Sequence, residues 1–144
     1  MNLRQLIDAW CLLALTVTVH AAGLAIVFRH LLHATTQPDP GFWKVTWVLI
    51  QLAAASVVLH LASITGWGMF YWWKKCFPDL ETAVYFSGVT YTTIGYGDLT
   101  LPVIWRLMAP VEGLTGILMA GLSTGLFFAV VSKYFAKRSG PENA

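Results

Sequence analysis

The chain of 144 residues has the length of a single domain, but 57% of its residues are hydrophobic and 11% are charged. Soluble domains have about 45–50% apolar and about 25% charged residues, so the composition excludes an ordinary soluble domain and indicates a membrane protein. The formal net charge is +2, and Lys133, Lys137 and Arg138 form a single basic group, which argues against nucleic acid as a partner. Membrane lipids are therefore the expected surroundings.

Three apolar runs are long enough to cross a bilayer, which requires about 20 residues of helix. They cover residues 9–28, 45–70 and 102–131. Residues 19–21 resemble a signal-peptide cleavage site, but the first run continues to residue 28, so we expect it to be retained as a transmembrane helix. Pro38 and Pro40 predict a helix-breaking link between the first two runs.

A short polar stretch separates the second run from the third. Residues 78–82 read PDLET, in which a proline and an Asp N-cap candidate predict the start of a helix over 80–91. Residues 92–98 follow and are too polar and too rich in glycine for contact with lipid. A short helix that enters the membrane and returns as an extended strand is tolerated only where its backbone lines a cavity filled with water or ions.

Backbone carbonyls are suitable ligands for a cation stripped of water, because they provide oxygens without a trapping charge. One strand offers one carbonyl per level, so several chains must surround an axis. Gly95 and Gly97 suit the backbone conformations that point successive carbonyls toward that axis. Thr93 adds a hydroxyl, and the C-terminal end of the preceding helix directs its partial negative charge at the cation.

Residues 92–98 read TTIGYGD and resemble the selectivity filter of the tetrameric potassium-channel superfamily; the resemblance extends over residues 45–135. It implies an all-α membrane protein whose subunit has three transmembrane helices, a re-entrant pore helix and a selectivity filter, assembled as a homotetramer. K+ would be the permeant ion, with no cofactor. The filter residues would be Thr92, Thr93, Ile94, Gly95, Tyr96, Gly97 and Asp98.

The resemblance also implies a role for each filter residue. The carbonyls of Thr93, Ile94, Gly95 and Tyr96, with the Thr93 hydroxyl, would form the K+ sites. Tyr96 would brace the filter against Tyr85 and Phe86, and Asp98 would lie at the outer mouth. Phe86 and Val89 occupy positions where simple bacterial members often have a tryptophan and a carboxylate, and neither can bond to Asp98. An inactivation mechanism based on such bonds is therefore in doubt.

The predicted organisation has three parts. Residues 1–41 would form an extra N-terminal helix and link, and residues 136–144 a short cytoplasmic tail. The pore domain, 42–135, would contain an outer helix (45–73), the pore helix (80–91), the filter (92–98) and an inner helix (102–131). The resemblance places the filter outward in a multi-pass cell membrane protein, as in a bacterial inner membrane.

Four residues at helical spacing predict the inner-helix face that lines the cavity: Ile117, Ala120, Thr124 and Phe128. The alternative is that this face contacts lipid. Gly116 lies where many family members have a gating hinge, and close packing is the alternative there. Gly121 and Gly125 fit a pattern of small residues at helix contacts.

Glu112 is the most costly residue to place in the membrane, about ten residues, or ~15 Å, along the predicted inner helix. His60 lies at a comparable predicted depth on the outer helix, so one hypothesis pairs the two by a hydrogen bond. The alternative is a structural acid bonded to the pore helix. His20 either joins them or is satisfied locally.

No run has basic residues at every third position, and few residues follow Tyr134, so we expect neither a voltage sensor nor a ligand-binding domain. The gate would be in the pore or depend on lipid, pH or an unidentified regulatory partner. Three alternatives stay open: a less selective cation channel, a non-conducting channel-like subunit, and an intramembrane serine hydrolase. The last rests on a G-x-S-x-G match at residues 121–125, in a helical rather than strand-turn context, so no enzyme activity is expected.

Overall fold

The computed structural model describes residues 3–35 and 41–138, and these ranges contain four helices and no strand. The helices are α1 (Leu3–Thr35), α2 (Phe42–Trp73), α3 (Leu80–Tyr91) and α4 (Met108–Arg138). Three of them are long and apolar enough to span a membrane, over Leu3–Leu31, Phe42–Trp73 and Met108–Lys133. The predicted all-α membrane fold with three spans is confirmed. Pro38, Pro40 and residues 139–144 of the predicted tail lie outside the described residues.

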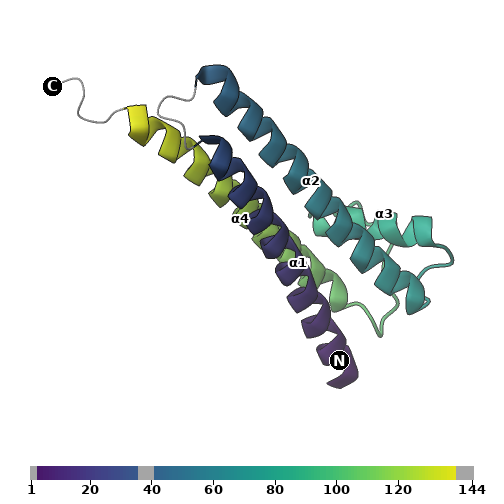
Figure 1. Ribbon diagram of the computed structural model, residues 1–144. Coiled ribbons are helices and arrows are strands. Elements are labelled where there is room, and N and C mark those ends of the chain that lie inside the picture. The colour runs from purple at the N-terminus through teal and green to yellow at the C-terminus, as the bar shows by residue number, and fades with distance from the viewer. Residues whose placement is uncertain (1–2, 36–40, 139–144) are drawn as a thin grey trace.

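The three long helices lie side by side, and the short α3 crosses one end of α2 (Figure 1). α1 and α4 run in the same direction and α2 runs opposite to both, so the N-terminal end of α1 lies at the same end of the bundle as the C-terminal end of α2. Trp43, Trp47, Trp72 and Trp73 are exposed near the two ends of α2. Exposed tryptophans at these levels are typical of the membrane–water interfaces.

The helix α3 occupies the predicted range 80–91 and begins with a side-chain cap. Asp79 accepts hydrogen bonds from the backbone N–H of Thr82 at 2.7 Å and from its hydroxyl at 2.8 Å. These bonds, the backbone one foremost, lower the pKa of Asp79. The cap satisfies one of the free N–H groups in the first turn of α3 and fixes the residue at which the helix begins.

Close approach of two backbones fixes where α3 crosses α2. A Cβ atom added to Gly68 would lie 2.8 Å from Cα of Val84. Around this crossing, Trp67, Tyr71 and Phe86 belong to the largest buried cluster. The small residue on α2 therefore allows the pore helix to lie against it without an intervening side chain.

The inner helix starts later than predicted. Residues 102–107 form turns, with the N–H of Trp105 bonded to the carbonyl of Pro102 and that of Met108 bonded to the carbonyl of Trp105. The Trp105 ring packs edge-on against Phe70 at 5.7 Å, so this segment docks on the end of α2 instead of extending α4. α4 then continues to Arg138, beyond the predicted end at residue 131.

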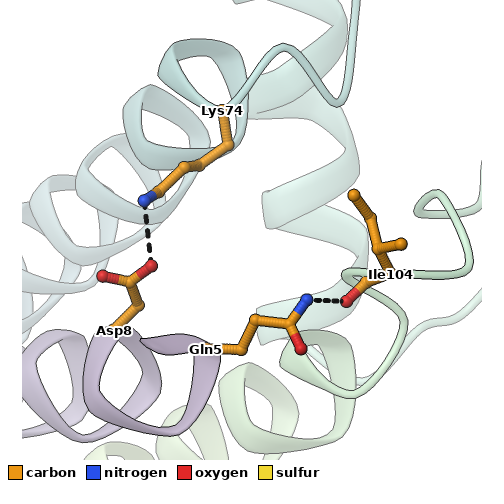
Figure 2. A network of polar contacts seen from close by, with 4 residues as sticks. All are labelled: Gln5, Asp8, Lys74 and Ile104. Atoms are coloured by element: carbon orange, nitrogen blue, oxygen red, sulfur yellow. Dashed lines mark hydrogen bonds and ion pairs between the residues drawn. The ribbon is translucent and has the colours of Figure 1, made fainter. Parts of the chain in front are cut away.

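The same region ties down the start of α1. Asp8 forms an ion pair with Nζ of Lys74 at 2.9 Å, and the side-chain amide of Gln5 donates to the carbonyl of Ile104 (Figure 2). Deeper in the bundle, Nε1–H of Trp67 donates to the hydroxyl of Thr16 at 3.1 Å. α1 is thus bonded to both α2 and the segment that leads into α4.

Candidate functional site

The segment after α3, residues 92–98, is not a β-strand in a sheet but has an alternating backbone, and it is called the strand below. Thr93, Gly95 and Gly97 have φ values of 62°, 60° and 78°, whereas Ile94 and Tyr96 between them do not have positive φ. Such alternation turns successive peptide groups to the same side of a strand, which lines up their carbonyls. Gly95 and Gly97 adopt these values at no steric cost, but Thr93 has a side chain and its left-handed conformation is strained.

Backbone hydrogen bonds to α3 hold the beginning of this strand. The N–H groups of Ile94 and Gly95 both bond to the carbonyl of Val89, and that of Thr93 bonds to the carbonyl of Thr90. All of residues 92–98 are exposed in the subunit, and no atom lies within 4 Å of a Cβ built on Gly95 or Gly97. Beyond its first residues, the strand therefore presents an open side to its surroundings.

The far end of the strand is bonded to the pore helix. The hydroxyl of Tyr85 donates to the carboxylate of Asp98 at 2.8 Å, and this bond raises the pKa of Tyr85. Sequence reasoning excluded Phe86 and Val89 as partners of Asp98 and missed Tyr85, although its phenol is the polar group one residue before Phe86. Tyr96 is 69% exposed within the subunit, so its predicted contact with Tyr85 and Phe86 stays a prediction.

A cavity of about 430 Å³ lies at the start of the strand. Its walls include Thr92 and Thr93 from the strand, Ile117 and Ala120 from α4, and His60 from α2. Two of the four residues predicted to line a cavity thus lie beside the strand. Thr124 and Phe128 are exposed further along α4, with the Thr124 hydroxyl bonded to the carbonyl of Ala120.

Gly116 is buried where α4 meets the end of α3. A Cβ atom added there would overlap the carbonyl oxygen of Tyr91. Of the two predicted roles, the geometry favours packing, because the missing side chain lets the two backbones touch. Gly121 and Gly125, in contrast, meet no other atom within 4 Å in the subunit.

The predicted hydrogen bond between Glu112 and His60 is wrong. Glu112 is fully buried and accepts from the Tyr71 hydroxyl at 2.8 Å, and its other oxygen bonds to the hydroxyl of Ser87. Because α4 begins at Met108, Glu112 lies in its second turn, level with the end of α2 and far from His60. The alternative prediction, an acid bonded to the pore helix, matches the contact with Ser87.

His60 belongs instead to a group of polar side chains deeper in the bundle. Its Nδ1 lies 3.1 Å from the Tyr91 hydroxyl and its Nε2 lies 3.4 Å from the Ser123 hydroxyl. Nε2 of His20 lies 3.0 Å from the same Ser123 oxygen, and the two imidazoles are 4.6 Å apart. The sequence had indicated His20 as a candidate but gave no sign that Ser123 and Tyr91 would meet the histidines.

This group does not have the geometry of a serine hydrolase. Ser123 is buried inside the continuous helix α4, whereas the G-x-S-x-G mechanism requires a sharp strand-to-helix turn that exposes the serine. Within the described ranges, no three His, Cys, Asp or Glu side chains come together as a metal site.

The fold and the site define a multi-pass membrane protein in which a short helix and an exposed polar strand are inserted between two spans. The sequence model of a family described as "Ion channel" matches residues 45–133, which include most of α2, all of α3, the strand and most of α4. The match covers well over half of the chain, so the chain belongs to this ion channel family. No curated protein and no solved structure matches the chain.

Proposed function

We propose that the chain is the subunit of a homotetrameric, potassium-selective channel that conducts K+ passively. The observation that carries this proposal is the alternating backbone of residues 93–97 in a TTIGYGD strand. Carbonyls on one side of a strand are the ligands that replace the hydration shell of K+ in a selectivity filter. The carbonyls of Thr93, Ile94, Gly95 and Tyr96 would hold the ion, with the Thr93 hydroxyl at the inner end.

The number of subunits follows from the number of oxygens. One strand supplies one carbonyl at each level, and a dehydrated K+ ion needs oxygens from all sides. The strand is open along the side that would face the axis, which fits closure by copies of the same chain. Four copies around one axis would enclose each ion between rings of carbonyls.

Two further features would favour a cation on this axis. α3 ends at Tyr91, so the partial negative charge of its C-terminus lies beside the inner end of the strand and the cavity of about 430 Å³. At the other end, Asp98 would place a carboxylate at the outer mouth, held by Tyr85. The strand would open outward and the end of α4 would lie in the cytoplasm.

The proposal is tested by ion flux from liposomes that contain the purified protein, with K+ and Na+ gradients compared and Ba2+ as a blocker. We expect K+ flux that exceeds Na+ flux, is blocked by Ba2+ and is lost in Gly95→Ala, because φ of +60° disfavours any side chain. Gly66→Ala is the matched control, since Gly66 is an exposed helical glycine of α2 with no atom near its Cβ position.

Other results would decide between the alternatives. Equal K+ and Na+ flux would indicate a less selective cation channel. A folded tetramer without flux in any condition would indicate a non-conducting subunit, and chemical cross-linking to a state other than four would contradict the assembly.

A further inference from the structure

We propose that His20, Ser123, His60 and Tyr91 form an intramembrane polar chain that positions the inner end of the filter strand and thereby sets ion selectivity. The inference rests on the proposed function, because it assigns positioning residues to the same filter. It concerns side chains from all four helices, including α1, which lies outside the matched residues 45–133.

The polar chain is continuous across the bundle. Its three contacts are 3.0 Å from His20 to Ser123, 3.4 Å from Ser123 to His60 and 3.1 Å from His60 to Tyr91. His20, Ser123 and Tyr91 are 0%, 6% and 3% exposed. Polar groups at this depth are costly unless they bond to one another, so their meeting at one point is a strong constraint on how the helices pack.

The number of available hydrogens favours one donor-to-acceptor order along the polar chain. Each neutral imidazole has one N–H and one acceptor nitrogen, and Nδ1 of His20 is buried without a partner. If His20 donates to Ser123, Ser123 to His60, and His60 to Tyr91, every contact is a hydrogen bond, the unpartnered Nδ1 of His20 is only a lone pair, and the Tyr91 hydrogen is left for Ser63, which also bonds to Tyr91. The opposite direction would leave a buried N–H unpaired, which is the rarer and costlier case.

The polar chain ends at Tyr91, the residue directly before the filter strand. Tyr91 is the last residue of α3, and Thr93, two residues later, is held in a left-handed conformation at φ 62°. A strained residue persists only when its surroundings leave it no alternative. Tyr91 is fixed on two sides, by Gly116 against its carbonyl and by His60 at its hydroxyl.

A shift of Tyr91 would therefore be transmitted directly to the first carbonyls of the filter. Thr92 and Thr93 are exposed, and their hydrogen bonds within the subunit run back to Gly88 and Thr90 of α3, the helix that Tyr91 ends. Selectivity depends on where those carbonyls lie relative to the ion. The polar chain thus makes α1, through His20, a part of the filter's support.

The test compares variants that each remove one hydroxyl from the chain, Ser123→Ala and Tyr91→Phe. We expect the ratio of K+ to Na+ permeability to fall by about threefold or more in each, the effect of losing one buried hydrogen bond. Ser123→Thr keeps the hydroxyl and should retain most of the ratio. Ser56→Ala is the matched control, because the buried Ser56 hydroxyl bonds at 2.8 Å to Leu52 of its own helix and lies outside the chain.

The double variant Ser123→Ala with Tyr91→Phe separates a connected chain from independent contacts. In a connected chain, the double variant should resemble the more affected single variant, because either change interrupts the same path. If Ser123→Ala does not assemble, Tyr91→Phe, which keeps the ring, decides the question alone.

Unchanged K+/Na+ permeability ratios in assembled Ser123→Ala and Tyr91→Phe would overturn the inference. This holds even if the melting temperatures of the variants fall, because lower stability with an unchanged ratio would show that the polar chain serves packing only. A wild-type protein without preference for K+ would overturn the proposed function as well, and that measurement precedes any variant. The two failures are therefore distinguishable.

Discussion

Gly116 decides how closely the inner helix approaches the end of the pore helix. Its Cα faces the carbonyl of Tyr91, so any side chain at this position would collide with backbone atoms. Backbone atoms cannot move aside by changing a rotamer, as a side chain could. This position resembles that of a hinge in sequence only. In the structure the absence of a side chain serves contact rather than bending.

Gly116→Ala is therefore expected to destabilise the protein by about 1–3 kcal/mol, the usual cost of overpacking, and to lower K+ flux. Thermal unfolding in detergent and liposome flux would measure the two effects. Gly66→Ala, in open surroundings on α2, should have no such cost. If the two variants behave alike, the close approach at Gly116 is wrong and the hinge interpretation regains support.

Tyr85 of α3 is bonded to Asp98, the residue at the outer end of the proposed filter. Tyr85→Phe removes the bond to Asp98 without changing the ring, so we expect K+ flux to decline faster with time after it begins. The bond raises the pKa of Tyr85, so its contribution is complete below the ordinary value of 10.0 and is lost only as pH rises through the raised value. The difference between wild type and variant should thus be constant from about pH 6 to 9. A difference that changes within this range would assign the effect to another group.

At the scale of elements, Glu112 joins three helices. It lies on α4 and bonds to Tyr71 of α2 and to Ser87 of α3, and the Ser87 hydroxyl also contacts the carbonyl of Ile64 at 2.8 Å. A serine has one hydroxyl hydrogen, so both of its contacts are hydrogen bonds only when the Glu112 oxygen carries a proton and donates. A neutral acid also suits a fully buried position.

Glu112→Gln should therefore be tolerated, because its amide donates to Ser87 and its carbonyl accepts from Tyr71. Glu112→Ala leaves the Tyr71 hydroxyl without this partner, whereas Ser87 keeps its bond to Ile64, and the change is expected to cost about 1–3 kcal/mol for the unpaired hydroxyl. Melting temperatures of the two purified variants provide the comparison. A larger loss of stability in the Gln variant than in the Ala variant would show that the carboxylate is charged.

The elements themselves were predictable where local chemistry fixes them. The range of α3 follows from local sequence signals. Asp79 caps its start, and the polar, glycine-rich residues that follow Tyr91 mark its end. The start of α4 does not follow from the sequence, since residues 102–107 are as apolar as the helix after them. They form turns in the structure, where Trp105 packs against Phe70 of α2, and this distant contact is not visible in the sequence. That error placed Glu112 too deep and suggested the wrong partner, His60.

The site was predictable to a similar degree. The strand conformation was expected from Gly95 and Gly97, since their freedom is local. The contacts of Ser123 with two histidines were not, because they depend on the rotation of three helices about their axes. Periodicity identifies a helix face but not which neighbour that face meets.

At the scale of the whole molecule, the direction of α1 places the chain's beginning at the same end of the bundle as the filter. The ion pair of Asp8 with Lys74 and the bond from Gln5 to Ile104 hold it there. In a background without Cys11 and Cys76, Leu3→Cys and Lys75→Cys should react with a membrane-impermeant thiol reagent from one side. Lys133→Cys should react only from the other, and labelling of all three from one side would contradict three spans.

In the proposed tetramer each subunit would give one wall to the filter, which has a consequence for cells that make both intact and damaged copies. No single copy would conduct in such an assembly, so an unassembled subunit would not leak ions across the membrane. A subunit with a defective strand, such as Gly95→Ala, would in contrast disrupt the carbonyl rings of every tetramer in which it is present. When wild-type and Gly95→Ala copies are co-expressed, the defect should therefore be dominant, and K+ flux should fall more steeply than the fraction of wild-type copies. A fall in proportion to that fraction would mean that each copy conducts alone.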